Sequence, residues 1–289
     1  MHFDKPVTEL IRERVSTRRY TPAPIDDERR GSLERFLRSI PPGPFGTLPR
    51  FGLIATSEEE SNVLRGLGTY GFIKGATGYI AGAVGPGEKN LEDFGYLMEA
   101  IILHATGLGL GTCWLGGTFT KRRFANRFDL RDGEEIPAIT SIGYPAGRAH
   151  APEAPPGQVA RLHPRLPWEV LFFDGQFGNP LSEKAAGEYS TALEMVRLGP
   201  SASNKQPWRI VRDGGSWHFA IQRSLLYGTR TLGLAGIADM PRLDVGIAMC
   251  HFELTARELG LRGNWRVADP GLEPNGARTE YSATWVSES

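Results

Sequence analysis

The chain has 289 residues, of which 40% are apolar and 23% charged, as in an ordinary soluble globular protein. That length suffices for one large domain or two medium ones whose core needs no disulfide or metal. Thirty-three basic residues balance thirty-three acidic ones, which argues against binding to nucleic acid or to an anionic membrane surface.

The N-terminus, Met-His-Phe-Asp-Lys-Pro, lacks the basic and apolar regions of a secretory signal. No apolar run approaches the roughly 20 residues that cross a bilayer, because Glu99 and His104 break the best candidate. The two cysteines, Cys113 and Cys250, are far apart and form no CxxC pair, which is typical of inert buried thiols. These features predict a cytoplasmic protein with no membrane contact.

The first half of the chain predicts three helices and three strands. Asp26 and Asp27 place acidic side chains at the positive end of the second helix. The third helix is the clearest, because its apolar residues are spaced for one buried stripe. The predicted helices are Val7–Val15, Glu28–Ser39 and Asn90–Thr106, and the predicted strands are Arg50–Ala55, Gly78–Val84 and Pro137–Tyr144.

A segment with four prolines and two glycines, Pro145–Gly157, predicts a linker. After it the order of elements starts again, with helices and strands alternating as in α+β or α/β layers. The predicted elements of this part are helices at Glu183–Arg197 and Leu243–Leu259 and strands at Trp208–Arg212, Trp217–Gln222 and Tyr281–Val286.

The restart extends to individual residues. At an offset of 151 residues, the two strongest helices align without a gap. A second offset, of 158 residues, places Pro42 on Pro200 and Pro49 on Pro207. We therefore predict an internal duplication with halves at residues 1–157 and 158–289. The pairs that coincide at the first offset are Asp93 and Asp244, Gly95 and Gly246, Met98 and Met249, Ala105 and Ala256, Gly109 and Gly260, Leu110 and Leu261, and Trp114 and Trp265.

Three segments carry residues suited to a ligand, and the first follows the N-terminal helix. Arg14, Ser16 and Arg18 alternate, so in an extended chain they face one side and could converge on an anion. Two guanidinium groups and a hydroxyl suit a phosphate. Taken alone, an arginine-rich helix end is more often simply solvated.

The second segment is the loop Pro-Ser-Ala-Ser-Asn-Lys-Gln-Pro-Trp at 200–208. Its small side chains let backbone approach a flat ligand, and Ser201 and Asn204 offer donors and acceptors. The alternative is a turn whose Ser and Asn only cap the next element.

The third segment, Gly-Leu-Gly-Leu-Gly-Thr-Cys-Trp-Leu-Gly-Gly at 107–117, contains the spacing of a dinucleotide fingerprint. That fingerprint requires a strand before it and a helix after it, whereas here a long helix comes first, so we reject it. Gly107 or Gly109 ends the helix. That role does not account for Gly116 and Gly117, whose backbone amides could face a ligand.

Together, Arg14-x-Ser16-x-Arg18-x-Tyr20, the loop at 200–208 and the Gly-Gly segment resemble the nitroreductase family of FMN enzymes, over most of the chain. The resemblance implies an α+β fold of two tandem α/β repeats that form an intrachain pseudo-dimer, with mixed or antiparallel sheets flanked by helices. It also implies a set of FMN contacts: Arg14, Ser16, Arg18 and Arg165 at the phosphate, Leu115, Gly116 and Gly117 near the ring, and Pro200, Ser201, Ala202, Asn204 and Gln206 from the second half.

The chain departs from that family pattern in a complementary way. The stretch Pro42–Pro49 lacks the Ser, Asn, Gln and Trp of its counterpart at 200–208, and the region after Gly260 lacks the Gly-Gly pair. Each half keeps what the other has lost. The chain therefore resembles the fused, two-repeat nitroreductases, for which we expect one composite site and a functional monomer.

The resemblance implies an NADH- or NADPH-dependent FMN oxidoreductase that reduces a small nitro, quinone or similar substrate by ping-pong hydride transfer. No catalytic side chain and no metal is expected, and the six scattered histidines are assigned structural roles. The alternatives are an FMN-binding protein without turnover, a dehalogenase-like branch whose lid would be Ser61–Gly87, and a pseudoenzyme without flavin.

Overall fold

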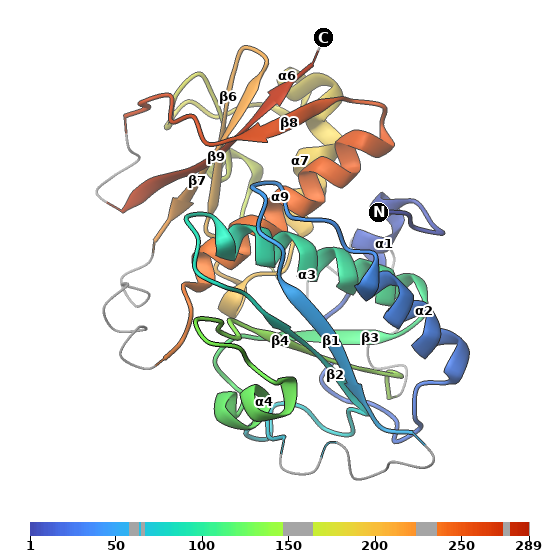
Figure 1. Cartoon of the computed structure of the whole chain (residues 1–289). Coiled ribbons are helices and arrows are strands. Elements are labelled where there is room, and N and C mark those ends of the chain that lie inside the picture. The colour runs from blue at the N-terminus through green and yellow to red at the C-terminus, as the bar shows by residue number, and fades with distance from the viewer. Residues whose placement is uncertain (58–63, 65–66, 147–163, 224–235, 274–277, 289) are drawn as a thin grey trace.

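Two β-sheets lie on opposite sides of a central pair of helices, α3 (Asn90–Gly107) and α9 (Met240–Glu258), as Figure 1 shows. The arrangement comes from a computed structural model, which describes residues 1–57, 64, 67–146, 164–223, 236–273 and 278–288. The predicted α+β fold class is confirmed. Within the described residues, none of the helices combines the length and the apolar character that crossing a bilayer requires.

The first sheet is entirely antiparallel and has the order β1-β2-β4-β3. Its register pairs Leu53 with Ile80 and Thr112 with Ile142. All six residues of β2 are buried, because this inner strand is covered by helices on one face and by a second apolar cluster on the other. The strands are β1 (Arg50–Ala55), β2 (Gly78–Ala83), β3 (Gly111–Leu115) and β4 (Ile139–Gly143).

The second sheet has the order β5-β6-β7-β9-β8 and is mixed, because β5 runs parallel to β6 while the other pairs are antiparallel. Without β5, this order repeats that of the first sheet, strand for strand along the chain. The matching topology supports the predicted duplication. The strands are β5 (Phe172–Asp174), β6 (Trp208–Asp213), β7 (Ser216–Gln222), β8 (Gly263–Arg266) and β9 (Thr279–Ser287).

The remaining helices cover the outside of this framework. Asp26 caps α2 by accepting the N–H of Arg29, which confirms the predicted acidic start of that helix. These helices are α1 (Val7–Glu13), α2 (Asp27–Arg38), α4 (Lys121–Phe128), α6 (Glu183–Ala186) and α7 (Ser190–Leu198), with 3-10 turns η2 (Trp168–Val170), η3 (Gly187–Tyr189) and η4 (Ala202–Asn204).

The central helix α3 differs from the prediction of one buried stripe, because it is buried all round. One face, including Phe94, Met98 and Ile102, packs in the core of the first sheet. The opposite face, including Leu97 and Leu103, packs in the core of the second half. A helix in the middle layer has no face in contact with solvent. The apolar stripe in its sequence therefore predicts only one of its two packed faces.

Three further predictions are corrected. The first helix ends at Glu13 and not at Val15, since the following residues pair with β3 in extended form. The predicted helix Glu183–Arg197 is interrupted at Gly187, whose φ is +60°. The sequence also missed β3, β5, β8 and α4, which are short.

Some predictions fall wholly or partly outside the described residues. These are most of the linker Pro145–Gly157, part of the lid candidate Ser61–Gly87, and the histidines His150 and His163.

Candidate functional site

The extended segment Arg14–Arg18 lies beside β3. Ser16 forms a parallel bridge with Thr112 of that strand. The same strand continues directly into Gly116 and Gly117. The first segment therefore pairs with the strand that leads into the Gly-Gly turn of the third segment.

In the segment Arg14–Arg18, the side chain of Arg14 is buried and that of Arg18 is exposed. Helix α1 ends just before Arg14, which takes extended backbone angles of φ −62° and ψ 120°. The Arg14 Nε lies 3.6 Å from a carboxylate oxygen of Glu99 and has no hydrogen-bond partner among the described residues. A buried guanidinium nitrogen without a partner is costly, and an anion would relieve that cost.

The loop 200–207 is held in an unusual backbone conformation. Ser203, Asn204 and Gln206 have φ values of 50°, 54° and 49°, in the left-handed region that non-glycine residues rarely adopt. The N–H of Gln206 donates to the Ser201 Oγ at 2.8 Å, which helps to fix the turn. Such strain costs about 1–3 kcal/mol per residue and is commonly found in ligand-binding segments.

Two side chains of this loop hold the segment that contains Arg165. The Arg165 guanidinium donates to the Asn204 Oδ1 at 2.8 Å and to the Leu198 carbonyl at 2.7 Å. The buried Gln206 accepts the N–H of Leu166 at 2.8 Å. The side chains of Asn204 and Gln206 thus bind the segment 165–166 and hold Arg165 next to the loop.

Arg165 also lies within electrostatic reach of Arg14, across the two halves. Burial lowers the pKa of Arg165 to about 10, and the positive charges of Arg14 and Arg197 add to that effect. Arg197 is paired with Glu194 at 2.6 Å, whereas Arg165 has no carboxylate bonded to it among the described residues. The structure thus brings Arg14 of the first segment close to Arg165 and to the loop that holds it, with a surplus of positive charge.

The glycines after β3 face the beginning of α9. A Cβ on Gly116 would collide with the sulfur of Met240, and a Cβ on Gly117 would press on Ile237. Leu115, just before them, is buried in the first half. This close approach requires bare backbone at Gly116 and leaves the Gly-Gly turn between the two halves.

The start of the loop is fixed by α9. The N–H of Ala202 donates to both carboxylate oxygens of Asp244, at 3.0 and 3.2 Å, and Pro200 is buried. Burial raises the pKa of Asp244 to about 8.

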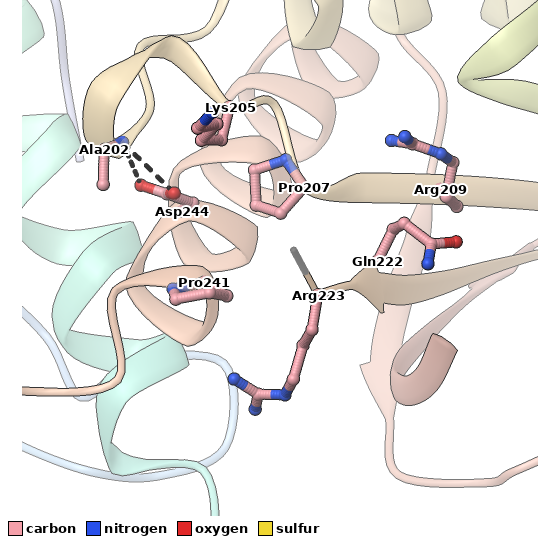
Figure 2. A pocket seen from close by; sticks show the side chains of 8 residues that line it. All are labelled: Ala202, Lys205, Pro207, Arg209, Gln222, Arg223, Pro241 and Asp244. Atoms are coloured by element: carbon pink, nitrogen blue, oxygen red, sulfur yellow. Dashed lines mark hydrogen bonds between the residues drawn. The ribbon is translucent and has the colours of Figure 1, made fainter. Parts of the chain in front are cut away.

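A pocket lies beside the loop, between it, α9 and the ends of β6 and β7 (Figure 2). Arg223 in this pocket is paired with Asp239 at 2.7 Å and with Glu280, so its charge is balanced. Lys205 and Arg209 have no carboxylate bonded to them among the described residues, and burial lowers the pKa of Arg209 to about 10. The lining residues are Ala202, Lys205, Pro207, Arg209, Gln222, Arg223, Pro241 and Asp244.

Two buried residues near Arg14 were missed as functional candidates from the sequence. Glu99 of α3 and His251 of α9 are both fully buried and lie 3.0 Å apart. Glu99 also accepts the indole N–H of Trp114 at 2.7 Å. A carboxylate in the middle of an apolar helix is the signal that could have identified them, because such a group needs partners.

The other predicted structural roles concern histidines and cysteines. His104 stacks on Phe36, and His218 bonds to Thr284 at 2.9 Å. Both cysteines are free and buried, as predicted, and burial raises the pKa of each thiol. Within the described part of the chain, no three His, Cys, Asp or Glu side chains gather to hold a metal ion.

Comparison with solved structures shows the fold. A "putative nitroreductase" from Thermotoga maritima matches with a TM-score of 0.62 at 20% identity, covering 99% of this chain and 95% of that chain. An "oxidoreductase containing FMN" covers 62% of this chain and 96% of its own, with 20% identity and a TM-score of 0.47. An "FMN-dependent nitroreductase" from Clostridium difficile R20291 covers 48% and 87%, with 22% identity and a TM-score of 0.38.

Among curated proteins, no sequence matches. A sequence model of one family does match, over residues 6–256, which is most of the chain. That span includes the Arg14 segment, the Gly-Gly turn and the strained loop. The chain therefore belongs to the family described as "Putative TM nitroreductase".

Proposed function

We propose that this protein is an FMN-dependent oxidoreductase that uses NADH or NADPH to reduce a small oxidised substrate, such as a nitro compound or a quinone. Nitroreductases are oxidoreductases, so the family gives the general class. The cofactor, donor and substrate class are inferences from the residues. The observation that carries them is the pair of guanidinium groups next to the strained loop, the buried Arg14 and the half-buried Arg165.

The residues present fit the phosphate of FMN. Arg14 has an unpartnered nitrogen, and the pKa of Arg165 is lowered by burial and then by the charge of Arg14. Both observations are explained if an anion belongs between them. Ser16 would add a hydroxyl, and the exposed Arg18 would close the site from outside.

The rest of the cofactor would lie between the Gly-Gly turn and the loop 200–207. Leu115, Gly116 and Gly117 would offer backbone on one side, and Pro200, Ser201, Ala202, Asn204 and Gln206 would form the other wall. When bound, FMN would supply hydride acceptance from the donor and hydride delivery to the substrate. The protein's task would be to orient both partners and to exclude water, with no nucleophilic side chain.

A single site per chain follows from the same placement. The phosphate contacts come from residues 1–157, apart from Arg165, and the loop comes from residues 158–289. One chain would therefore do what two subunits do in a simple homodimer, and it would act as a monomer. The pocket lined by Lys205 and Arg209 borders the loop through Ala202, and we assign the small substrate to it.

The test is a spectrum and mass of the protein as purified, followed by anaerobic titration with NADH and NADPH. We expect a yellow protein with one FMN per chain whose flavin absorbance is bleached by one of the donors. Two FMN per chain would contradict the single composite site. Bound FMN that neither donor bleaches would instead make the chain a flavin-binding protein without turnover.

A further inference from the structure

A buried network joins the two halves directly behind the proposed phosphate site. Its centre is Glu99, in the middle of α3 and fully buried. One oxygen of Glu99 lies 3.0 Å from the Nε2 of His251 and 3.6 Å from the Nε of Arg14. The other oxygen accepts the indole N–H of Trp114 at 2.7 Å. Three elements therefore converge on this carboxylate of α3: α9, β3 and the segment after α1.

The hydrogen bonds of His251 fix how many protons this network holds. Its Nδ1 lies 2.8 Å from the carbonyl oxygen of Met195, which can only accept, so Nδ1 carries a proton. The contact between Nε2 and Glu99 then needs one more proton between the two groups. Whether that proton is nearer nitrogen or oxygen, the Glu99–His251 pair has no net charge.

The surroundings of Glu99 favour its ionised form. Burial raises the pKa of this carboxyl, but the hydrogen bond and charge of His251, the charge of Arg14 and the Trp114 indole outweigh that effect, so the pKa is lowered. The neighbouring Cys250 thiol contributes no charge, because burial raises its pKa well above the ordinary value.

The charges of the cluster then add up to a definite surplus. Arg14 and Arg165 contribute two positive charges, the Glu99–His251 pair contributes none, and Arg197 is neutralised by Glu194. A phosphate monoester carries about 1.5–2 negative charges at pH 7. The surplus matches that ligand, provided that Glu99 stays paired.

We propose that His251 and Glu99 are positioning residues that act through Arg14, with His251 cancelling the charge of Glu99 so that the site is matched to a phosphate dianion. The pair would thereby select FMN over riboflavin, which has the same ring but no phosphate. This inference rests on the proposed function, because it presumes that the anion is the phosphate of FMN.

The experiment measures the affinity of the apoprotein for FMN and for riboflavin by flavin fluorescence. His251→Gln leaves Glu99 as an uncompensated anion beside the phosphate, so we expect FMN affinity to fall at least about tenfold and riboflavin affinity to change less than about threefold. Glu99→Gln with His251→Gln removes both charges and should restore FMN affinity to within about threefold of the original. The control is His218→Gln, a buried histidine bonded to Thr284 in the second sheet, which should change neither affinity.

The outcomes separate the two proposals. An apoprotein that binds neither flavin refutes the proposed function. Equal weakening of both flavins by His251→Gln, or no recovery in the double variant, refutes the charge match and leaves FMN binding intact. A nitrogen-15 spectrum of the histidines in the unmodified protein tests the network even if a variant does not fold. The Nδ1 of His251 should carry a proton, as its contact with the Met195 carbonyl requires, and an unprotonated Nδ1 would overturn the assignment.

Discussion

The two halves of this protein are alike in the centre of the molecule and differ in the loops around it. In the centre, α3 and α9 contact each other through corresponding residues: a Cβ on Gly95 would collide with the carbonyl of Leu243, and a Cβ on Gly246 with the carbonyl of Glu92. Glu92 and Leu243 are themselves separated by the same 151 residues as the glycines. Reciprocal contacts of this kind are the mark of a two-fold interface, here within one chain.

The helix ends repeat the same symmetry. Gly109 and Gly260 follow α3 and α9 with φ values of +74° and +79°, and the next residue in each case donates its N–H back to the helix. At the helix starts, Asp93 accepts N–H groups from the loop of the first half, as Asp244 does from the loop of the second half.

The loops themselves have diverged. Residues 42–49 keep the bounding prolines and the contact with Asp93, but not the polar side chains found at 200–207. The loop at 200–207 keeps those side chains together with three left-handed residues. Residues that hold the framework are present twice and residues assigned to the ligand once, which is what a duplicated scaffold with one remaining site predicts.

The largest expected effect comes from removing the arginine charges that are assigned to the FMN phosphate and that only the first half possesses. Arg14→Ala with Arg18→Ala should release FMN, because two charge-assisted contacts of about 1.5–3 kcal/mol each correspond to a loss of affinity on the order of a thousandfold. The measurement is flavin retained per chain after gel filtration, followed by titration of the apoprotein with FMN.

The matched control lies on the same stretch of chain. Arg12→Ala with Arg19→Ala removes the same charge from two exposed side chains and should leave FMN affinity within about threefold. Equal loss in both double variants would mean that net charge alone attracts the cofactor, and unchanged retention in the first would place the phosphate elsewhere.

Much of the framework follows from the sequence because local patterns there agree with the tertiary contacts. Strand Arg50–Ala55 is observed with the predicted bounds, and the duplicated Asp-x-Gly at the helix starts indicated residues with paired structural roles. The site segments at Arg14, Gly116 and Pro200 were identifiable because polar or bare residues stand where packing does not require them. The resemblance implies that these segments share one ligand, and the structure places Arg14, Arg165 and the loop near one another.

What the sequence did not reveal depends on contacts between distant residues. Glu99 and His251 stand in apolar helices and were read as a break and as a structural histidine, since their pairing spans 152 positions of the chain. Strand β3 was missed because it has only five residues, of which four are buried, so it lacks the apolar–polar alternation that predicts a strand. The burial of α3 on both faces could not be seen without α9.

A smaller effect, on stability alone, is expected from substitutions at the contact between α3 and α9. Gly95→Ala and Gly246→Ala should each destabilise the protein by about 3 kcal/mol, because the added methyl would meet a backbone carbonyl that cannot rotate away. Chemical denaturation of the apoprotein measures this loss. Gly133→Ser is the control, since a Cβ there meets no atom within 4 Å and any cost reflects only its φ of +79°. Similar losses at both helix positions support the two-fold interface, and a loss at only one would break the symmetry.

The smallest difference distinguishes the two helix-start aspartates. Asp93 uses one carboxylate oxygen for the N–H of Phe45, at 2.9 Å, and the other for the N–H of Thr47, at 2.8 Å. Asp244 directs both oxygens at the single N–H of Ala202. An asparagine can therefore replace Asp244 without losing a bond, whereas at position 93 its amide would face an N–H donor. We expect Asp93→Asn to cost about 1–3 kcal/mol and Asp244→Asn to cost much less near neutral pH.

The pH dependence of stability sharpens this contrast. An unfolded aspartate ionises near pH 4, while burial raises the folded pKa of Asp244 to about 8. Between these values the unfolded state releases the proton and the folded state keeps it, so this group stabilises the fold fully below about pH 4 and progressively less up to about pH 8. Asp244→Asn removes that dependence. Its free energy of unfolding should match or exceed that of the original protein at pH 8 and lose the advantage at pH 5. If denaturation curves at the two pH values shift equally in the variant and the original, Asp244 is ionised in the folded state and its carboxylate is the true partner of Ala202.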